Sequence, residues 1–316
     1  MQSFREKTIG GYNCFVANGY IFDVRRFSIH DGPGIRTTVF FKGCPLHCLW
    51  CHNPESQLFS PELMILSNRC IGCGACSAVC PYGAISEVDG VWVTDRKKCV
   101  VCGKCGEVCY ADGRQIVGEQ KSADEIMKII DQDKAFYLES NGGVTFSGGE
   151  PLAQPDLLQE LLEQCKARGY HTALDTSGNA AWGVIEPLLD KLDLILFDLK
   201  LMSSDLHRHY TGAGNELILS NLRELAKRMV SVWIRVPIIP GVTDGEANLS
   251  AMAEFLSELK LQTRVFLLPY HHVATTKYAN VGHDYKLEPT HIPTEAEMTA
   301  LDYYFKQAGI PVQHGG

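Results

Sequence analysis

Eleven of the thirteen cysteines of this 316-residue chain lie between positions 44 and 109, which limits how that segment can fold. No apolar stretch follows the early charges Arg5, Glu6 and Lys7, so the sequence shows no secretion signal that would favour disulfides. Crowded thiols in a reducing compartment indicate metal binding. We therefore expect a cytoplasmic protein whose cysteine-rich segment is organised around metal centres.

The first cysteine group, Cys44, Cys48 and Cys51, lies within GCPLHCLWCHNPES. Iron-sulfur clusters are normally held by four thiolates, so a group of three leaves one iron open to a ligand that is not protein. The alternative is structural zinc with His47 or His52 as the fourth ligand. Structural zinc motifs usually pair two C-x2-4-C knuckles, and no second knuckle completes this one. The spacing therefore favours a catalytic [4Fe-4S] cluster.

Residues 70–109 contain an internal repeat of the spacing C-x2-C-x2-C-x3-C, first in Cys70, Cys73, Cys76 and Cys80, then in Cys99, Cys102, Cys105 and Cys109. Bacterial two-cluster ferredoxins have this spacing, and there the fourth cysteine of each run ligates the other cluster. We expect one [4Fe-4S] cluster on Cys70, Cys73, Cys76 and Cys109, and a second on Cys99, Cys102, Cys105 and Cys80. A zinc-binding repeat is the alternative.

Two cysteines fall outside these groups. Cys165 follows leucines at helical spacing and is expected to be a buried apolar residue. Cys14 has no assignable role. Tyr110 stands where the second run would usually carry proline, which alters a turn and leaves the ligand count unchanged.

Composition sets the remaining limits. A hydrophobic content of 45% in 316 residues is enough for a large core. No run approaches the ~18 apolar residues that span a bilayer. The net charge of -8 argues against nucleic acid as a partner.

Outside the repeat, short β-rich runs alternate with helical patterns, which predicts βα units and a parallel sheet. We expect six strands, near residues 37–41, 144–147, 172–176, 194–199, 232–238 and 265–268. A capping box at Ser122 and Glu125 opens one helix, and another runs from Asp156 to Arg168. The expected fold is a partial (β/α)6 TIM-like barrel of residues 1–60 and 115–316, with residues 61–114 inserted as a ferredoxin-like domain.

Polar residues follow the predicted strands, where barrels of this type carry their function. Besides the cysteine loop, they are Ser147, Gly148, Gly149 and Glu150, then Asp175 and Thr176, Asp198, Leu199 and Lys200, Arg235, and His271. Because side chains alternate along a strand, Asp198 and Lys200 should share one face with Leu194 and Leu196. Glycines let backbone approach a ligand closely, and Glu150 can accept an ammonium group.

These residues, with HDGPGIR at 30–36, CHNPES, GGVTFSGGEP, DTSG, DLK and LLPYHHVATTKY, resemble radical S-adenosylmethionine (SAM) enzymes. They are most similar to activating enzymes of glycyl radical enzymes that carry a two-cluster ferredoxin insert. The resemblance extends from about Gly19 to His314 and implies an oxidoreductase with SAM and three [4Fe-4S] clusters.

The resemblance also implies roles for individual residues. SAM would chelate the open iron of the Cys44, Cys48 and Cys51 cluster, with Trp50 and His52 beside its nucleoside. The methionyl amino group would lie against Ser147, Gly148, Gly149 and Glu150. The carboxylate, the ribose region or a monovalent cation would be held by Asp175, Asp198, Lys200, Arg235 and His271, with Thr176 and Leu199 next to them. The turn that meets the partner's glycine loop would be Asp31, Gly32, Pro33 and Gly34.

The implied reaction is reductive cleavage of SAM, followed by abstraction of hydrogen from a glycine Cα of a partner lyase, dehydratase or decarboxylase by a 5'-deoxyadenosyl radical. Flavodoxin or ferredoxin would donate the electron, through the inserted clusters or with those clusters as a docking scaffold only. A monomer is expected. Two alternatives remain from the residues: a radical SAM enzyme acting on a small molecule, and a ferredoxin-type electron carrier.

Overall fold

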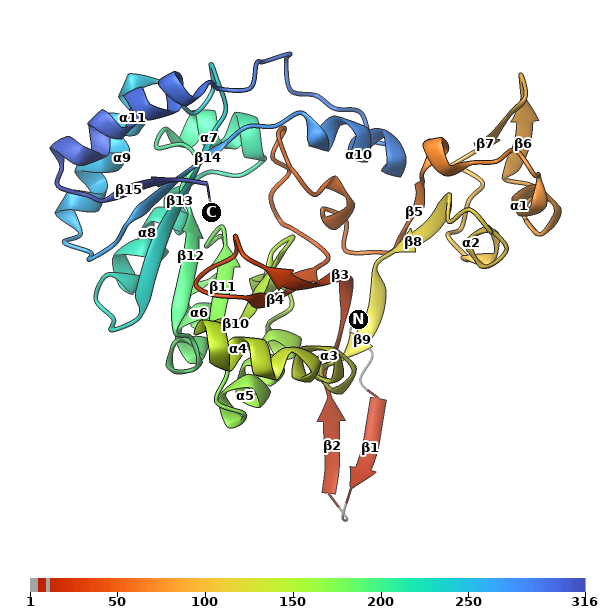
Figure 1. The fold of residues 1–316 in the computed structure, drawn as a ribbon, viewed down its shortest axis with the longest axis horizontal. Coiled ribbons are helices and arrows are strands. Elements are labelled where there is room, and N and C mark those ends of the chain that lie inside the picture. The colour runs from red at the N-terminus through yellow and green to blue at the C-terminus, as the bar shows by residue number, and fades with distance from the viewer. Residues whose placement is uncertain (1–4, 10–11, 316) are drawn as a thin grey trace.

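A computed structural model describes residues 5–9 and 12–315, and its main feature is a nine-stranded sheet of order β15-β14-β13-β12-β11-β10-β4-β3-β9 (Figure 1). All six predicted strands are confirmed as parallel neighbours in chain order. They are β4 (Arg36–Phe41), β10 (Gly143–Gly148), β11 (His171–Thr176), β12 (Leu194–Asp198), β13 (Ser231–Ile238) and β14 (Val265–Pro269).

Three further strands extend this sheet at its edges. β15 (Val312–His314) pairs in parallel with β14 at one edge. At the other edge β3 (Asn18–Ser28) lies antiparallel to β4, and β9 (Glu119–Ser122) lies antiparallel to β3. A separate hairpin joins β1 (Arg5–Ile9) to β2 (Tyr12–Val16). The side chain of Cys14 lies outside the described part of the chain.

Helices cover one face of the sheet and bury the larger core with it (Figure 1). They are α3 (Ala123–Ile130), α4 (Lys134–Ser140), α5 (Pro155–Ala167), α6 (Trp182–Ile185), α8 (Glu216–Leu225), α9 (Glu246–Glu258) and α11 (Glu295–Gln307). Two further helices, α7 (Ser204–Thr211) and α10 (Val273–Val281), contribute no residue to this core. Short 3₁₀ segments occur at Pro54–Ser56, Ser67–Arg69, Asp131–Asp133, Pro151–Ala153 and Glu186–Lys191. None of the described helices is long and apolar enough to cross a membrane.

Local sequence signals explain where two of these helices begin and end. Ser122 and Glu125 form the predicted capping box at the start of α3, each side chain bonding the other residue's backbone N–H. The predicted helix at 156–168 is α5, and Gly169 follows it with a φ of 72°, which favours glycine. Cys165 is fully buried in the larger core, as expected.

Strand alternation separates the two faces of the sheet. Ile195, Phe197 and Leu199 lie in the core beneath the helices. Leu194 and Leu196 lie in a second, smaller cluster with Ala173 and Trp233. The predicted alternation is therefore correct, and the side chains that follow Leu194 and Leu196 on the same face can reach the interior of the fold.

The cysteine repeat forms a lobe that projects from the sheet (Figure 1). Its elements are β5 (Glu62–Ile65) paired with β8 (Arg114–Val117), the hairpin of β6 (Ile85–Val88) and β7 (Val91–Thr94), and the short helices α1 (Ala75–Ala78) and α2 (Lys104–Glu107). Gly74 and Gly103 precede these helices at matching positions of the repeat, with φ of 71° and 83°. A small core of Leu63, Cys76, Ile85 and Cys105 fills the lobe.

Candidate active site at the carboxyl ends of the strands

A cavity of about 200 Å³ lies at the carboxyl ends of the parallel strands. The structure brings most of the predicted site residues to its wall, namely Cys44, Cys48, Cys51, Trp50, His52, Ser147, Gly148, Gly149, Asp175, Thr176, Asp198, Lys200 and Arg235. These residues come from four strands, β10 to β13, and from the loop after β4. Side chains far apart in the sequence therefore share one cavity.

The cysteine loop is fixed by backbone hydrogen bonds. The N–H of Gly43 donates to Ser56 O (2.6 Å), and that of Cys44 donates to Gln57 O (3.1 Å).

Burial raises the pKa of Cys48 to about 12 and also raises the pKa of Cys44 and Cys51. Without metal these thiols are protonated, so metal binding here must displace protons.

Gly148 brings β10 into direct backbone contact with the end of β4, and Gly149 does the same with the cysteine loop. A Cβ at Gly149 would lie 2.4 Å from Gly43 O, and one at Gly148 would lie 2.5 Å from Phe41 N. Gly148 also has a φ of 110°, where side chains are strained. The glycines are therefore required by protein backbone, in addition to any ligand that reaches the cavity.

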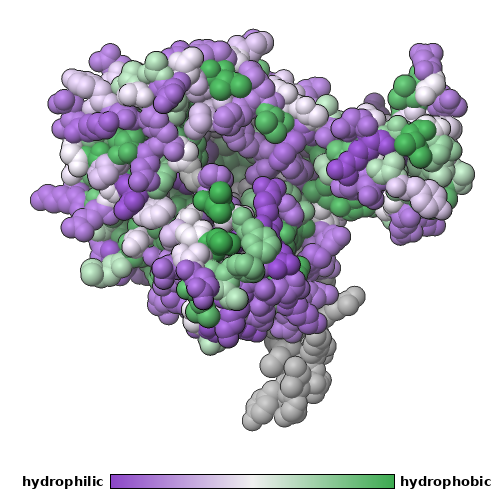
Figure 2. All heavy atoms as spheres, in the orientation of Figure 1, coloured by the Kyte–Doolittle hydropathy of each residue, from purple (hydrophilic) through white to green (hydrophobic). Residues whose placement is uncertain are grey.

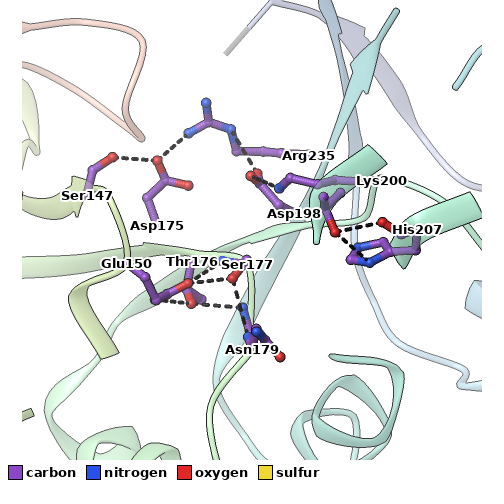
Figure 3. A network of polar contacts seen from close by, with 12 residues as sticks. Ser147, Glu150, Asp175, Thr176, Ser177, Asn179, Asp198, Lys200, His207 and Arg235 are labelled. Carbon is purple, nitrogen blue, oxygen red and sulfur yellow. Dashed lines mark hydrogen bonds and ion pairs between the residues drawn. The ribbon is translucent and has the colours of Figure 1, made fainter. Parts of the chain in front are cut away.

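Four charged side chains form the polar wall of the cavity (Figure 3). Arg235 Nη1 lies 3.0 Å from Asp175 Oδ2, its Nε lies 3.8 Å from Asp198 Oδ1, and Lys200 Nζ lies 2.7 Å from Asp198 Oδ2. Ser147 Oγ donates to Asp175 at 2.6 Å. Arg235 Nε and Asp198 Oδ1 are buried and make no hydrogen bond within the described part of the chain. This wall can therefore still bind polar groups.

Burial and neighbouring charges set the protonation of this wall. Burial raises the pKa of Asp175 to about 6, although Arg235 opposes the shift. Burial lowers the pKa of Arg235 and Lys200, but the carboxylates beside them outweigh it and hold both values above the ordinary range. The two cations therefore stay charged, while Asp175 titrates near neutrality.

Glu150 does not lie on the cavity wall (Figure 3). Its buried carboxylate accepts hydrogen bonds from Thr176 Oγ1 (2.7 Å), from Ser177 Oγ (2.6 Å) and N (2.9 Å), and from Leu152 N (3.2 Å). Burial raises the pKa of Glu150, and these donors oppose the shift. In the structure Glu150 therefore holds the turn after β11.

Two other predicted contacts are also not brought to the wall. The side chain of Leu199 lies in the core under the helices, because alternation directs it away from Asp198 and Lys200. His271 is exposed, and its ring centroid is 6.5 Å from that of His52. The preceding residue, Tyr270, is 1% exposed and lines the cavity instead.

Sequence reasoning missed several wall residues. They include Asn53, Ser56, Ser177, Ile239 and Tyr270. All but Ile239 are within motifs already singled out, CHNPES, DTSG and LLPYHH, so the motifs marked their segments. Which residue of each motif faces inward depends on loop geometry, which the sequence did not reveal.

The predicted partner turn lies close to this wall. Asp31 Oδ2 accepts a hydrogen bond from Thr38 Oγ1 (2.7 Å), and its charge raises the pKa of both Asp175 and Arg235. Arg36 is fully buried and donates to Pro33 O at 3.0 Å. The turn is therefore held inward, toward the charged side chains of the cavity.

The lobe contains two further cavities, and their walls divide its eight thiols into the predicted sets. One, of about 60 Å³, is lined by Cys70, Cys73, Cys76 and Cys109. The other, of about 20 Å³, is lined by Cys80, Cys99, Cys102 and Cys105. Among the described residues, no three Cys, His, Asp or Glu side chains are drawn together as ligands of a single metal ion. Ligation of a cluster by each set stays a prediction.

Comparison with known proteins identifies the family. The model of the Radical SAM superfamily matches residues 38–252. A trans-4-hydroxy-L-proline dehydratase activating enzyme from Clostridioides difficile is 42% identical, and the alignment covers 95% of this chain and 100% of the relative. An indoleacetate decarboxylase activating enzyme from Tractidigestivibacter scatoligenes is 40% identical over 92% of this chain and 95% of the relative. A choline trimethylamine-lyase activating enzyme from Oleidesulfovibrio alaskensis is 39% identical over 92% of this chain and 96% of the relative. The chain belongs to the glycyl radical enzyme activating enzymes of the radical SAM superfamily.

The main cavity of this activating enzyme suits the two groups that its family uses, a [4Fe-4S] cluster and SAM. Three thiols on one wall supply three of four cluster ligands. Arg235 and Asp198, whose Nε and Oδ1 make no hydrogen bond among the described residues, offer a donor and an acceptor for an amino acid. Trp50, 4% exposed, and Tyr270 give an aromatic wall for a nucleoside.

Proposed function

We propose that this enzyme uses the cavity of Cys44, Cys48 and Cys51 to activate a partner glycyl radical enzyme of the lyase, dehydratase or decarboxylase type. The observation that carries this proposal is one cavity lined both by three thiols and by the charged side chains of Asp175, Asp198, Lys200 and Arg235. When bound, the cluster and SAM supply a reductive cleavage that generates the species able to abstract hydrogen from a glycine Cα.

Residues of the chain bind and orient SAM in this proposal. Arg235 and Lys200 attract its carboxylate, while Asp198 and Asp175 balance their charge and can hold a monovalent cation. Trp50 and His52 shelter the nucleoside. The backbone at Gly149 approaches the methionyl amino group.

The lobe is proposed to be the ferredoxin-like insert, with about eight irons in two [4Fe-4S] clusters and three clusters in the whole enzyme. Its two four-thiol cavities support this assignment. The lobe would serve the transfer of electrons from a flavodoxin or ferredoxin, and the enzyme would act as a cytoplasmic monomer. The turn of Asp31, Gly32, Pro33 and Gly34 would meet the partner's glycine loop.

The decisive experiment presents reconstituted enzyme, SAM and a reductant to a panel of glycyl radical enzymes. The panel contains a trans-4-hydroxy-L-proline dehydratase, an indoleacetate decarboxylase and a choline trimethylamine-lyase, and electron spin resonance detects the radical. We expect a persistent glycyl radical on one partner and 5'-deoxyadenosine in solution. Cys44→Ala should abolish both.

The outcomes separate the alternatives. Turnover that depends on a small molecule and leaves no radical on any partner would support a small-molecule enzyme and contradict the proposal. No 5'-deoxyadenosine from fully reconstituted protein would leave only the electron carrier.

A second experiment tests the lobe. Cys70→Ala combined with Cys99→Ala should slow reduction of the remaining cluster by flavodoxin, while dithionite should still reduce it. Iron content and absorbance spectra report whether the Cys44, Cys48 and Cys51 cluster is retained. Unchanged reduction by flavodoxin would contradict electron transfer through the lobe and favour a scaffold.

A further inference from the structure

An exposed aromatic pair lies beside the turn that precedes β4. Phe27 is 50% exposed and has a φ of 60°, a backbone conformation that is strained for a bulky residue. The register of β3 against β4 shifts between Arg25 and Ser28, so Phe27 lies in a bulge. Ile29 next to it is 64% exposed and Phe136 of α4 is 41% exposed. Apolar surface is thus displayed at some conformational cost.

This surface is held rigidly. The rings of Phe27 and Phe136 pack edge to face with centroids 5.0 Å apart, and the Arg26 guanidinium lies 5.1 Å from the Phe27 ring centroid. Arg26 Nε donates to both carboxylate oxygens of Asp133, at 2.9 and 3.0 Å. Asp133 is fully buried and also accepts from Thr37 Oγ1 of β4 at 2.7 Å. These side chains therefore lose little conformational entropy when a partner binds.

The same surface is joined to the turn of residues 31–34. Ile35 N donates to Ser140 Oγ of α4 at 2.8 Å, and Ser140 Oγ donates to Phe136 O at 2.7 Å. Asp31 is held against β4 and β10, because its Oδ2 accepts from Thr38 Oγ1 and its O accepts from Thr145 Oγ1, each at 2.7 Å. Figure 2 shows apolar atoms over the region of β4 and α4, beside the central hollow of the molecule. The aromatic pair and the inward-held turn thus form one continuous surface.

We propose that Phe27, Ile29 and Phe136, with Arg26, form a docking surface for the glycyl radical enzyme that this chain activates. This proposal rests on the proposed function, because the occupant must be a protein that delivers a glycine to the neighbouring cavity. Aromatic residues and arginine dominate the energetic centres of protein interfaces, and this cluster has that composition. A rigid aromatic anchor beside the turn would fix the partner's orientation while its glycine loop enters.

The test is a double variant, Phe27→Asn with Phe136→Ala. Asparagine tolerates positive φ, so the bulge should fold without added strain. The Michaelis constant for the partner identified by the radical assay should rise about tenfold or more, because hot-spot aromatics are lost. The turnover rate at saturating partner and the SAM cleavage without partner should stay unchanged. Met229→Ala, at a fully exposed residue preceding β13, is the matched control and should change none of these values.

Direct binding to a partner whose radical glycine is replaced by alanine gives a second readout. Equal affinity and equal Michaelis constants for wild type and double variant would overturn the proposal. A wild type that dimerises in size-exclusion chromatography, with a monomeric double variant, would show a self-association surface and would also overturn it. Failure of the proposed function would look different from failure of the docking surface. In that case the wild-type enzyme would not generate a glycyl radical on any partner of the panel.

Discussion

At the scale of single residues, the charged wall of the cavity combines a buried lysine and a partly buried arginine with two carboxylates. Arg235 is shared between Asp175 and Asp198, and Lys200 pairs with Asp198. Burying a cation without a counter-charge costs several kcal/mol of folding free energy. Each carboxylate therefore stabilises the folded protein, in addition to any contact that it makes with a ligand. Asp175, with its pKa raised to about 6, is the member whose charge changes in an accessible pH range.

The pH dependence of stability should reveal Asp175. An unfolded Asp ionises near 3.8, so between pH 4 and 6 the folded protein retains a proton that the unfolded chain has lost. Its contribution to stability therefore falls as pH rises through this window. The measurement is the free energy of unfolding of metal-free protein in urea, for wild type and for Asp175→Asn. The wild-type value minus the variant value should be smaller at pH 7 than at pH 4.5. Equal differences at the two pH values would contradict the raised pKa, and the exposed Asp284→Asn is the control.

Glu150 gives a second prediction for a single residue. Each of its oxygens accepts hydrogen bonds, so Glu150→Gln would place an amide N–H against existing donors such as Ser177 N. The free energy of unfolding of metal-free protein should fall by about 1–3 kcal/mol. Exposed Glu163→Gln should change it little. If Glu150→Gln left stability intact and weakened only SAM binding, direct contact with the ligand would be its main role.

Sequence reasoning at this scale succeeded where a regular strand fixed the answer. Alternation along β12 placed Asp198 and Lys200 correctly, because the side-chain period of a strand is two. No such period applies after β14 ends at Pro269, so the sequence could not show that Tyr270 lines the cavity while His271 is exposed. The four donors to Glu150 were not predicted either, because they come from the distant turn at 176–177 and the nearby 3₁₀ segment. Ligand contacts of His271 and Glu150 stay predictions.

At the scale of elements, the six central strands were predictable because each is a buried β-branched or aromatic run. β4 is buried along its whole length. The edge strands β9 and β15 were missed, since they are short, polar and partly exposed. Helix α10 was also missed, although its sequence, within LLPYHHVATTKY, had been singled out. Its hydrophobic residues show no strong helical period, so tertiary contacts are what position it.

Those contacts join α10 to both the cysteine loop and the lobe. Lys277 Nζ donates to Asn53 Oδ1 and Glu55 Oε1, each at 2.8 Å. Beyond the helix, His283 Nε2 lies 3.1 Å from Glu62 Oε1 at the base of the lobe. Arg96 of the lobe donates to Asn280 O at 3.0 Å. The position of the cysteine loop and that of the lobe are therefore coupled through one helix.

Lys277→Met should loosen the cysteine loop. Glu55 is 8% exposed and would lose its cationic partner, so we expect about 1–2 kcal/mol of lost stability, limited because Lys277 itself is about one-third exposed. Hydrogen exchange should accelerate in residues 44–57 before it does in β10. Lys277→Arg should retain part of the effect, and exposed Lys286→Met should match wild type. Unchanged exchange in the loop would show that α10 does not hold it.

At the scale of the whole molecule, the lobe and the sheet have separate cores. The larger core contains no residue between 66 and 113, and the lobe is filled by its own small cluster. The repeat of cysteine spacing interrupts the βα pattern and predicts an insert of residues 61–114, whose bounds as a domain stay a prediction. It could not predict that β5 and β8 would carry the lobe as one antiparallel ladder, because that pairing joins residues about fifty positions apart.

That ladder allows the lobe to be removed cleanly. Ile65 and Arg114 are cross-strand partners, so residues 66–113 can be replaced by the two-residue turn Asn-Gly. The shortened protein should fold, because the larger core is intact, and should bind about four irons in place of about twelve. With dithionite it should form 5'-deoxyadenosine near the wild-type rate, and with flavodoxin about tenfold more slowly or less. Equal rates with flavodoxin would show that the lobe is not needed for electron supply. Full loss of activity with dithionite, in a folded protein that keeps its irons, would show instead that α10 needs the lobe to position the cysteine loop.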